Sequence, residues 1–310
     1  MNTVGPERWW FGNLNLYLPQ WPWALPCVAI GPWYLMSAWR WSWIPLLMLG
    51  WVFGPLMGLS LGPARIMPKP DGARLRVMTY NVKWGFRDAA AVLQNIAAAS
   101  PDVILMQDSA GATESKLAAL RKPGWNEVRL NQYTVLSKYP VSEPTEQWTT
   151  PDRTHSCMRC VLQLGARAVT LYDVHFITPR WALGSFADNG PDGTLDLEQN
   201  ANLRELEAFM LADRIRAEKG PLILAGDLNA PIQSRACKSL FRAGLRDAYS
   251  EAGVGYGYTY GQSTPLERPF VRIDHILVSP EWAILNCREG SSLGSDHSPV
   301  VADLVLPDKL

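Results

Sequence analysis

Between residues 11 and 62 the chain carries a single charged residue, Arg40. Within this stretch, residues 21–39 and 43–62 are each close to the roughly 20 apolar residues that cross a bilayer as a helix. Nine of the fourteen Trp residues lie in this stretch or just before it, and several flank the two segments, as Trp does at membrane interfaces. We therefore predict an N-terminal membrane region at residues 1–67, with two spans joined as a hairpin around Arg40.

Two alternatives to this hairpin stay open: a pair of buried core helices, or one span beside a segment that lies in the membrane interface. Pro22, Pro26 and Pro32 weaken the first helix, although membrane helices tolerate Pro better than other helices do. With two spans, the protein would be a multi-pass protein of the cell membrane. Counted literally, the basic residues after the second segment would place the C-terminal part in the cytoplasm.

The sequence changes character after a linker at residues 68–74 that contains Pro and Gly. In residues 75–310, short apolar runs such as "PDVILMQD" and "PLILAGDLN" alternate with helical stretches such as "RDAAAVLQNIAAAS". Several other apolar runs are separated only by a turn, which gives too many hairpin-linked strands for a doubly wound parallel sheet. We therefore predict that residues 75–310 form a mixed α/β domain.

Polar side chains recur where the apolar runs of this domain end. They are Asn81, Asp108, His175, Asp227 with Asn229, Asp274 with His275, and Asp296 with His297. Any one of them could cap a helix or close a turn, as Asn and Asp often do. That explanation does not account for the recurrence of carboxylate, carboxamide and imidazole groups, or for three of the four His residues of the chain. Strand ends hold side chains rigidly and leave them open to a ligand, so these residues form a candidate site.

The residue types at these positions favour one kind of chemistry. Carboxylates without a His/Cys cluster suit a hard cation such as Mg²⁺ or Mn²⁺ and not zinc. Asn and His can donate to phosphate oxygens, and an Asp close to a water molecule can orient or deprotonate it. No Ser or Cys nucleophile with its own base is visible in the sequence. The pattern therefore predicts metal-assisted hydrolysis of a phosphoryl compound.

An ordered set of motifs carries a family resemblance. The set is "TYNVKWG", "PDVILMQD", "VLSKYPV", "DVHF", "LAGDLN", "RIDHILVS" and "GSDHSPV", and it covers about residues 75–306. In this order the motifs resemble the endonuclease/exonuclease/phosphatase superfamily. The resemblance implies a four-layer α/β sandwich of two packed mixed sheets with helices outside. It also implies cleavage of a phosphoester that depends on a divalent metal.

The resemblance assigns roles to the residues of the motifs. Asp108 would be the main metal-binding carboxylate, with Asn81 and Asp296 beside the metal. His175 and Asn229 would contact the substrate phosphate, and so would Asn81. In this set Asp108 stands where the family usually has Glu, and a side chain shorter by one methylene would change the affinity for the metal or the choice of metal.

The remaining roles concern the water and the base. Asp227 would orient or activate the water. His297 would act as base or phosphate clamp and would be held by Asp274. A second departure from the family is Asp173, which stands where Asn is usual and would bring an unhelpful negative charge if it faced the phosphate.

The predicted hairpin makes the chain similar to the bacterial membrane-anchored branch of this superfamily, which includes proteins of the teicoplanin-resistance type. That likeness implies a membrane-anchored phosphohydrolase, with its catalytic domain outside the cytoplasm. Its substrate would be a phosphoester or pyrophosphate, lipid-linked among other options. The implied partners are the lipid bilayer and a phosphorylated substrate.

Two other functions remain open. A nuclease is the alternative within enzymes. Four of the 29 basic residues and one of the 29 acidic residues precede residue 71, which leaves 25 basic against 28 acidic residues from residue 71 onward. A slightly acidic domain gives no electrostatic basis for non-specific binding to DNA. A non-catalytic membrane receptor or scaffold on the same fold is the alternative of another class, and the shortened Asp108 is its support.

Overall fold

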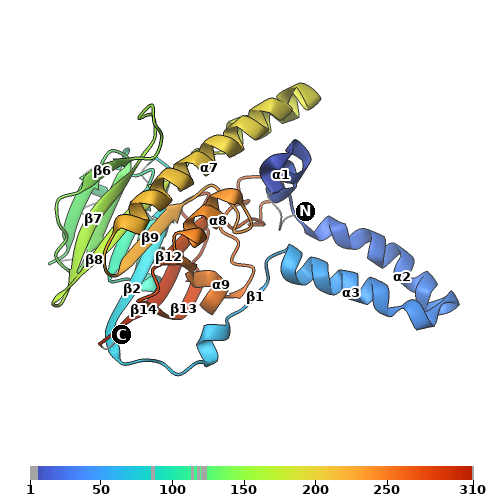
Figure 1. Cartoon of the computed structure of the whole chain (residues 1–310), viewed down its shortest axis with the longest axis horizontal. Helices are drawn as coiled ribbons and strands as arrows, with labels where there is room; N and C mark the ends of the chain where they lie inside the picture. Colours follow the sequence, from blue (N-terminus) through green and yellow to red (C-terminus); the bar gives the residue numbers. More distant parts are fainter. Residues whose placement is uncertain (1–5, 85–87, 113–114, 117–118, 120–123, 309–310) are drawn as a thin grey trace.

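Two mixed β-sheets packed face to face form the body of the protein (Figure 1). The computed structural model describes residues 6–84, 88–112, 115–116, 119 and 124–308. The first six-stranded sheet has the order β13 (Ala283–Glu289), β14 (Val300–Pro307), β2 (Gly72–Asn81), β3 (Val103–Gln107), β5 (Tyr133–Ser137) and β4 (Asn126–Leu130). The second six-stranded sheet has the order β10 (Arg246–Asp247), β12 (Asp274–Val278), β9 (Leu222–Asp227), β8 (Arg167–His175), β7 (Ser156–Leu164) and β6 (Thr145–Trp148).

Each sheet contains a parallel pair among antiparallel neighbours. In the first sheet β2 runs parallel to β3, and in the second β8 runs parallel to β9. The antiparallel pairs β14–β2 and β12–β9 flank them. The prediction of mixed sheets in an α/β sandwich is therefore confirmed.

The main hydrophobic core lies between the two sheets. Alternate residues of the central strands point into it, among them Val77 and Val103 from the first sheet and Leu171 and Ile223 from the second. All four side chains are fully buried. Because side chains alternate along a strand, the neighbouring residues of these strands point to the outer faces, where they need helices to cover them.

Helices cover both outer faces of the sandwich. Helix α4 (Ala89–Ala99) packs Val92 and Ile96 against the first sheet. Helices α7 (Thr194–Ala217) and α8 (Arg235–Arg242) pack Leu211 and Leu240 against the second. Helices α6 (Arg180–Asn189), η6 (Gly190–Gly193) and α9 (Ala248–Ala252) also belong to this part of the chain.

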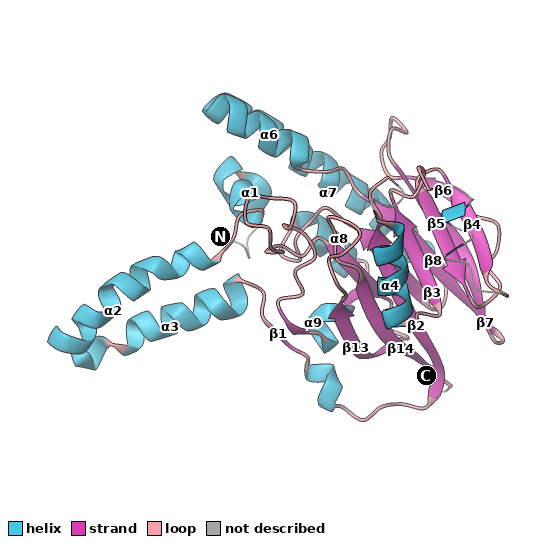
Figure 2. Cartoon of the chain, turned by 180° about the vertical axis from the view of Figure 1, so that it is seen from behind, coloured by secondary structure: helices cyan, strands magenta, loops and turns pink. Residues whose placement is uncertain are grey.

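The N-terminal region forms a helical hairpin that projects from the sandwich (Figures 1 and 2). Its elements are α2 (Leu25–Ser37), η3 (Trp39–Trp41), α3 (Trp43–Trp51) and the π-helical turn η4 (Val52–Leu56). We call residues 25–56 the apolar hairpin, because most of its large apolar side chains are exposed, including Trp33, Leu46 and Leu47.

The apolar hairpin contradicts the prediction of two membrane spans. None of the helices in the described part of the chain is long and apolar enough to cross a membrane. Helix α2 has 13 residues, which at 1.5 Å per residue is about 20 Å, short of the ~30 Å hydrocarbon core. The turn predicted around Arg40 lies at η3, but the predicted span at 21–39 is divided between η2 and α2, and that at 43–62 ends as α3 at Trp51, before the π-helical turn that contains Pro55. The multi-pass placement in the cell membrane, with the domain beyond residue 75 on its outer side, is therefore wrong.

Segments on both sides of the apolar hairpin are attached to the sandwich. Before it come η1 (Pro6–Arg8), α1 (Trp10–Leu16) and η2 (Trp21–Ala24); after it come β1 (Ser60–Leu61) and η5 (Pro63–Ile66). The Asn13 side chain donates to the carbonyl of Leu197 on α7, over 2.7 Å. Strand β1 pairs with β11 (Val254–Gly255) in a two-stranded sheet. The hairpin is thus held at both of its ends.

Candidate active site

Strand ends from both sheets meet at one edge of the sandwich. Asn81 is the last residue of β2, His175 the last of β8 and Asp227 the last of β9, while Asp108 directly follows β3. These strands form the two parallel pairs, and the carboxyl ends of parallel strands lie at the same edge of a sheet. Asp274 begins the antiparallel strand β12 directly opposite Asp227.

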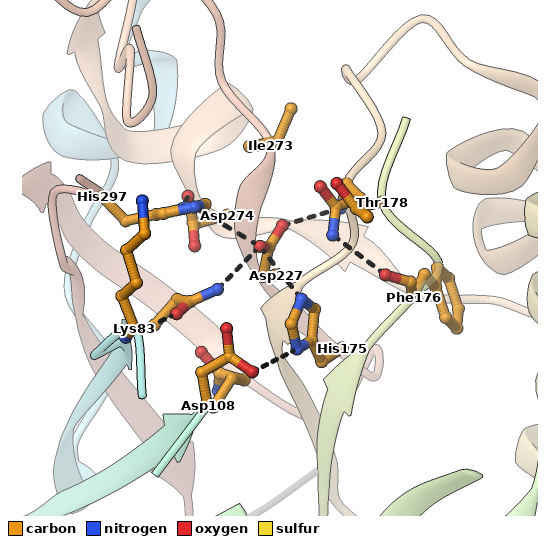
Figure 3. Close-up of polar contacts among 12 residues, drawn as sticks. Lys83, Asp108, His175, Phe176, Thr178, Asp227, Ile273, Asp274 and His297 are labelled. Carbon is orange, nitrogen blue, oxygen red and sulfur yellow. Dashed lines mark hydrogen bonds and ion pairs between the residues drawn. The ribbon is translucent and has the colours of Figure 1, made fainter. Parts of the chain in front are cut away.

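The carboxylate of Asp227 lies at the centre of this cluster (Figure 3). Its Oδ2 accepts a hydrogen bond from the side-chain amide of Asn81 over 3.0 Å. The Nε2 atoms of His175 and His297 lie 3.6 and 3.7 Å from the same oxygen. Its Oδ1 accepts from the backbone amide of Asn229 over 2.8 Å. A buried carboxylate is thus surrounded by donors from both sheets.

Burial and neighbouring charges set the protonation of this centre. Burial opposes the charged form of His297, but the carboxylates of Asp274 and Asp227 outweigh it and raise the His297 pKa to about 10. His297 Nδ1 lies 2.9 Å from Asp274 Oδ2, which holds the ring in place. Burial and the charge of Asp274 together raise the pKa of Asp227 above its ordinary value. A carboxylate with a raised pKa is a better proton acceptor than one in water.

The tautomer of His175 follows from its partners. Its Nδ1 lies 2.7 Å from the side-chain oxygen of Gln132, which can only accept. Nδ1 therefore carries a proton, and Nε2 faces Asp227. Asp108 Oδ1 lies 3.6 Å from the same Nδ1, so His175 stands between two carboxylates.

Asp296 is the carboxylate with the most unusual surroundings. Its Oδ2 is paired with the ammonium of Lys83 and lies 3.5 Å from the guanidinium of Arg180. Its Oδ1 is buried and has no hydrogen-bond partner among the described residues, and the same holds for Oδ1 of Asp274. A buried carboxylate oxygen without a partner costs free energy, which a bound cation would relieve.

The donor set fits a hard divalent cation. Asp108, Asn81 and Asp296 offer carboxylate and carboxamide oxygens, which Mg²⁺ and Mn²⁺ prefer. Among the described His, Cys, Asp and Glu residues, the group with the spacing of a metal site comprises Asp227, Asp274 and His297, whose ligand atoms lie within 4.8 Å of one another. Each set contains a buried carboxylate oxygen without a partner among the described residues, Oδ1 of Asp296 in the first and Oδ1 of Asp274 in the second.

The backbone around the site is strained where these side chains are presented. Lys83, Asp108 and Asn229 have φ values of 41°, 54° and 47°, in the left-handed region. Asp and Asn tolerate this region better than other non-glycine residues, and such strain is typical of functional sites. One residue before Asp227, Gly226 has φ 152°, and a Cβ there would collide with the carbonyl oxygen of Val174. The Gly in "LAGDLN" therefore lets β9 approach β8 closely.

All eight residues assigned by the sequence lie together in the structure. Seven of them line a cavity of about 680 Å³: Asn81, Asp108, His175, Asp227, Asn229, Asp296 and His297. Asp274 lies behind them and holds His297. The described geometry brings these side chains together, and their individual roles remain proposals.

Asp173, the second departure from the family pattern, does not face the site. It lies between the two sheets and accepts a 2.6 Å hydrogen bond from Gln107 Nε2. Burial raises the pKa of Asp173 well above its usual range. It therefore places no negative charge against a phosphate.

Several residues of the site were not assigned from the sequence. Lys83, Gln132 and Tyr17 also line the cavity. Lys83 lies two residues after Asn81 in the motif "TYNVKWG", so this motif contained a signal for it. Gln132 comes from the turn between β4 and β5, and Tyr17 comes from the distant N-terminal segment; no local pattern marks either.

Comparisons with known proteins agree with this geometry. Residues 78–297 match the model of the Endonuclease/Exonuclease/phosphatase family. Similar solved structures include a family member from Bacteroides thetaiotaomicron at 17% identity, which covers 78% of this chain and 98% of that chain with a TM-score of 0.56.

Two further similar structures have named activities. A mannosyl-6-phosphatase from Bacteroides thetaiotaomicron shares 16% identity, with 74% of this chain and 99% of that chain covered and a TM-score of 0.54. A 3'-5' exonuclease from Neisseria meningitidis shares 19% identity, with 74% and 98% covered and a TM-score of 0.54. No curated protein matches the sequence. The family match spans more than half of the chain, and the chain therefore belongs to the endonuclease/exonuclease/phosphatase family, whose members hydrolyse phosphoesters.

Proposed function

We propose that this protein is a divalent-metal-dependent phosphohydrolase that cleaves a phosphoester or pyrophosphate by in-line attack of water. The observation that carries the proposal is the buried carboxylate of Asp227, surrounded by Asn81, His175, His297 and Asn229 from both sheets. Such an arrangement holds a proton acceptor beside several hydrogen-bond donors. It suits a reaction in which water is deprotonated next to an anionic phosphate.

Each residue of the site has its own role in the proposed reaction. Asp227 accepts the proton of the attacking water, and Asn81 and the backbone of Asn229 orient its carboxylate. The protonated His297 donates to a phosphate oxygen, and His175 contacts the phosphate from the end of β8. A cation held by Asp108, Asn81 and Asp296 would neutralise charge that develops on the phosphate.

The bond changes balance without any further reagent. The oxygen of water forms a bond to phosphorus while the bond from phosphorus to the ester oxygen breaks. The ester oxygen leaves with the bonding electrons and takes a proton from solvent, and the water proton goes to Asp227. The products are a phosphate and an alcohol, or two phosphates when the substrate is a pyrophosphate.

A nuclease is the weaker candidate within this family. The exonuclease among the similar structures shows that the fold can support it. In this chain, however, the two cations at the site, Lys83 and Arg180, are engaged with Asp296. The excess of acidic residues beyond residue 71 also opposes non-specific binding to DNA.

A substrate panel tests the proposal. The full-length protein is incubated with p-nitrophenyl phosphate, bis-p-nitrophenyl phosphate, geranyl pyrophosphate and plasmid DNA, each with Mg²⁺, with Mn²⁺ and with EDTA. We expect metal-dependent turnover of at least one small phosphoester or pyrophosphate, and little cleavage of DNA. Preferred cleavage of DNA that weakens steeply with salt would support the nuclease. A folded protein that turns over none of the four would support the non-catalytic scaffold.

A further inference from the structure

The cavity at the active site is lined by two chemically different sets of residues. The polar set holds the catalytic candidates together with Lys83 and Arg180. The cavity is also lined by apolar residues that pack together in one cluster, namely Tyr17, Leu183, Phe270, Val271 and Ile273. We call this second set the apolar wall. A volume of about 680 Å³ is in the range of cavities that hold small-molecule ligands, and it is more than a phosphate alone would fill.

The apolar wall is built from segments far apart in the sequence. Tyr17 and Ile273 are buried in one cluster, against which Leu183 of α6 and Phe270 pack. The hydroxyl of Tyr17 donates to the carbonyl of Asn229 over 2.9 Å. Because that hydroxyl already has a partner, Tyr17 contributes an apolar ring to the wall. The hydrogen bond also ties the wall to a residue of the catalytic cluster.

The apolar surface continues toward the base of the apolar hairpin. A second, smaller cavity shares Phe270 and Val271 with the first and is also lined by Leu16, Leu56 and Met57. The segment at Met57 is fixed there, since the hydroxyl of Tyr258 donates to its carbonyl. Phe270 and Val271 therefore lie between the active-site cavity and the end of the apolar hairpin.

We infer that the substrate is an amphiphilic phosphate ester, whose apolar group lies on the apolar wall while its phosphate lies at Asp227. This inference rests on the proposed function, because the phosphate must occupy the catalytic cluster. Contiguity supports it: the wall and the cluster line one cavity, so a single ligand contacts both. The hydroxyls of a sugar phosphate would lie against the apolar wall without hydrogen-bond partners. An alkyl or aryl ester would instead bury apolar surface there, which favours its binding.

Varying the length of the alkyl group in the substrate tests the inference. The full-length protein is incubated with Mg²⁺ and with methyl, propyl, butyl or hexyl phosphate. The rate of phosphate release gives kcat/KM for each ester. We expect kcat/KM to rise by roughly fourfold for each methylene that becomes buried on the wall. A kcat/KM that is independent of chain length, with methyl phosphate turned over, would overturn the inference and leave the proposed function intact.

A pair of matched variants locates the effect. Leu183→Asn places an amide in the apolar wall, whereas Leu195→Asn makes the same change at an exposed position on α7. We expect Leu183→Asn to lower the ratio of kcat/KM for hexyl phosphate to kcat/KM for methyl phosphate about tenfold relative to the wild type. Leu195→Asn should behave as the wild type with both esters. Equal losses with both esters in Leu183→Asn would contradict the role of the wall. No turnover by the folded wild type of any of these esters, nor of p-nitrophenyl phosphate, bis-p-nitrophenyl phosphate or geranyl pyrophosphate, would overturn the proposed function itself.

Discussion

At the scale of single residues, burial decides which side chains carry charge. Asp227, Asp173 and Glu207 are all buried carboxyls with raised pKa values, but their surroundings differ. Asp227 faces two imidazoles, Asp173 has one hydrogen-bond donor between the sheets, and Glu207 accepts from the amide of Ile177 and the hydroxyl of Thr149. Only the first can exchange a proton with a ligand in the cavity, so the other two affect stability and not chemistry.

Glu207 makes the stability of the protein depend on pH. Burial raises the pKa of Glu207 to about 7, against the hydrogen bonds from Ile177 and Thr149 that lower it. The folded state therefore binds a proton that the unfolded state releases near pH 4.5. Its contribution to stability is present below about pH 4.5 and is lost as the pH rises to about 7. We expect the free energy of unfolding to fall by up to about 3 kcal/mol over this window.

Urea denaturation of the wild type and of Glu207→Gln at pH 5 and pH 8 measures this effect. The Gln variant keeps the shape of the side chain and cannot ionise. Its free energy of unfolding should change less between the two pH values than that of the wild type. An identical change in both proteins would show that Glu207 is not the group responsible.

At the scale of elements, the N-terminal segment belongs to the wall of the site. Helix α1 packs on α7, and Tyr17, directly after α1, bonds to the carbonyl of Asn229. Asn229 holds a left-handed backbone conformation with φ 47° and donates through its side chain to the carbonyl of Phe176. A contact from a distant segment thus helps to fix a strained residue of the catalytic cluster.

Removing one hydroxyl tests this attachment. Tyr17→Phe leaves the buried carbonyl of Asn229 without its donor, and we expect the free energy of unfolding to fall by about 1 kcal/mol. Tyr34→Phe is the matched control, because the hydroxyl of Tyr34 has no hydrogen bond among the described residues. Chemical denaturation of both variants gives the comparison. Equal stabilities would mean that Tyr17 does not hold the segment to the sandwich.

The elements of the sandwich could be predicted from the sequence because each is specified locally. The apolar run "LILAGD" predicts a buried strand, and its end places Asp227 at an edge. The turn around Arg40 could be predicted, but the lengths of the two helices could not, because composition indicates an apolar segment and not where its helices end. The 3-10 turn η2 and the π-helical turn with Pro55, which limit the two helices, depend on the conformation of a few residues. Gln132 and Tyr17 were missed because their contacts exist only in the folded chain.

At the scale of the whole molecule, the apolar hairpin is the most unusual surface. Large apolar side chains are exposed around both helices, and Arg40 is its one charged residue. Monomeric proteins rarely expose contiguous apolar patches of this kind, and such patches mark contact surfaces. In water we therefore expect the hairpin to associate with other copies of the chain or to bind detergent.

Light scattering after size-exclusion chromatography measures this behaviour. In buffer without detergent we expect the wild type to elute well above the 34.6 kDa of one chain. The double variant Leu46→Gln/Leu47→Gln should shift toward the monomer, because both side chains are 64% exposed on the hairpin. The double variant Leu195→Gln/Leu203→Gln makes the same exchange at exposed positions of α7 and should elute as the wild type does. A monomeric wild type that binds no detergent would contradict the prediction.

The most direct test of the central claim is the activity of Asp227→Asn. The variant keeps the size of the side chain but cannot accept the proton of the water. We predict that kcat/KM for the best phosphoester in the presence of Mg²⁺ falls by about 10²- to 10⁴-fold. Asp213→Asn, at an exposed position of α7, should retain the wild-type rate. EDTA should abolish the activity of both the wild type and Asp213→Asn. Wild-type turnover by Asp227→Asn, with the protein folded, would contradict the assignment of Asp227 as the proton acceptor and with it the proposed site.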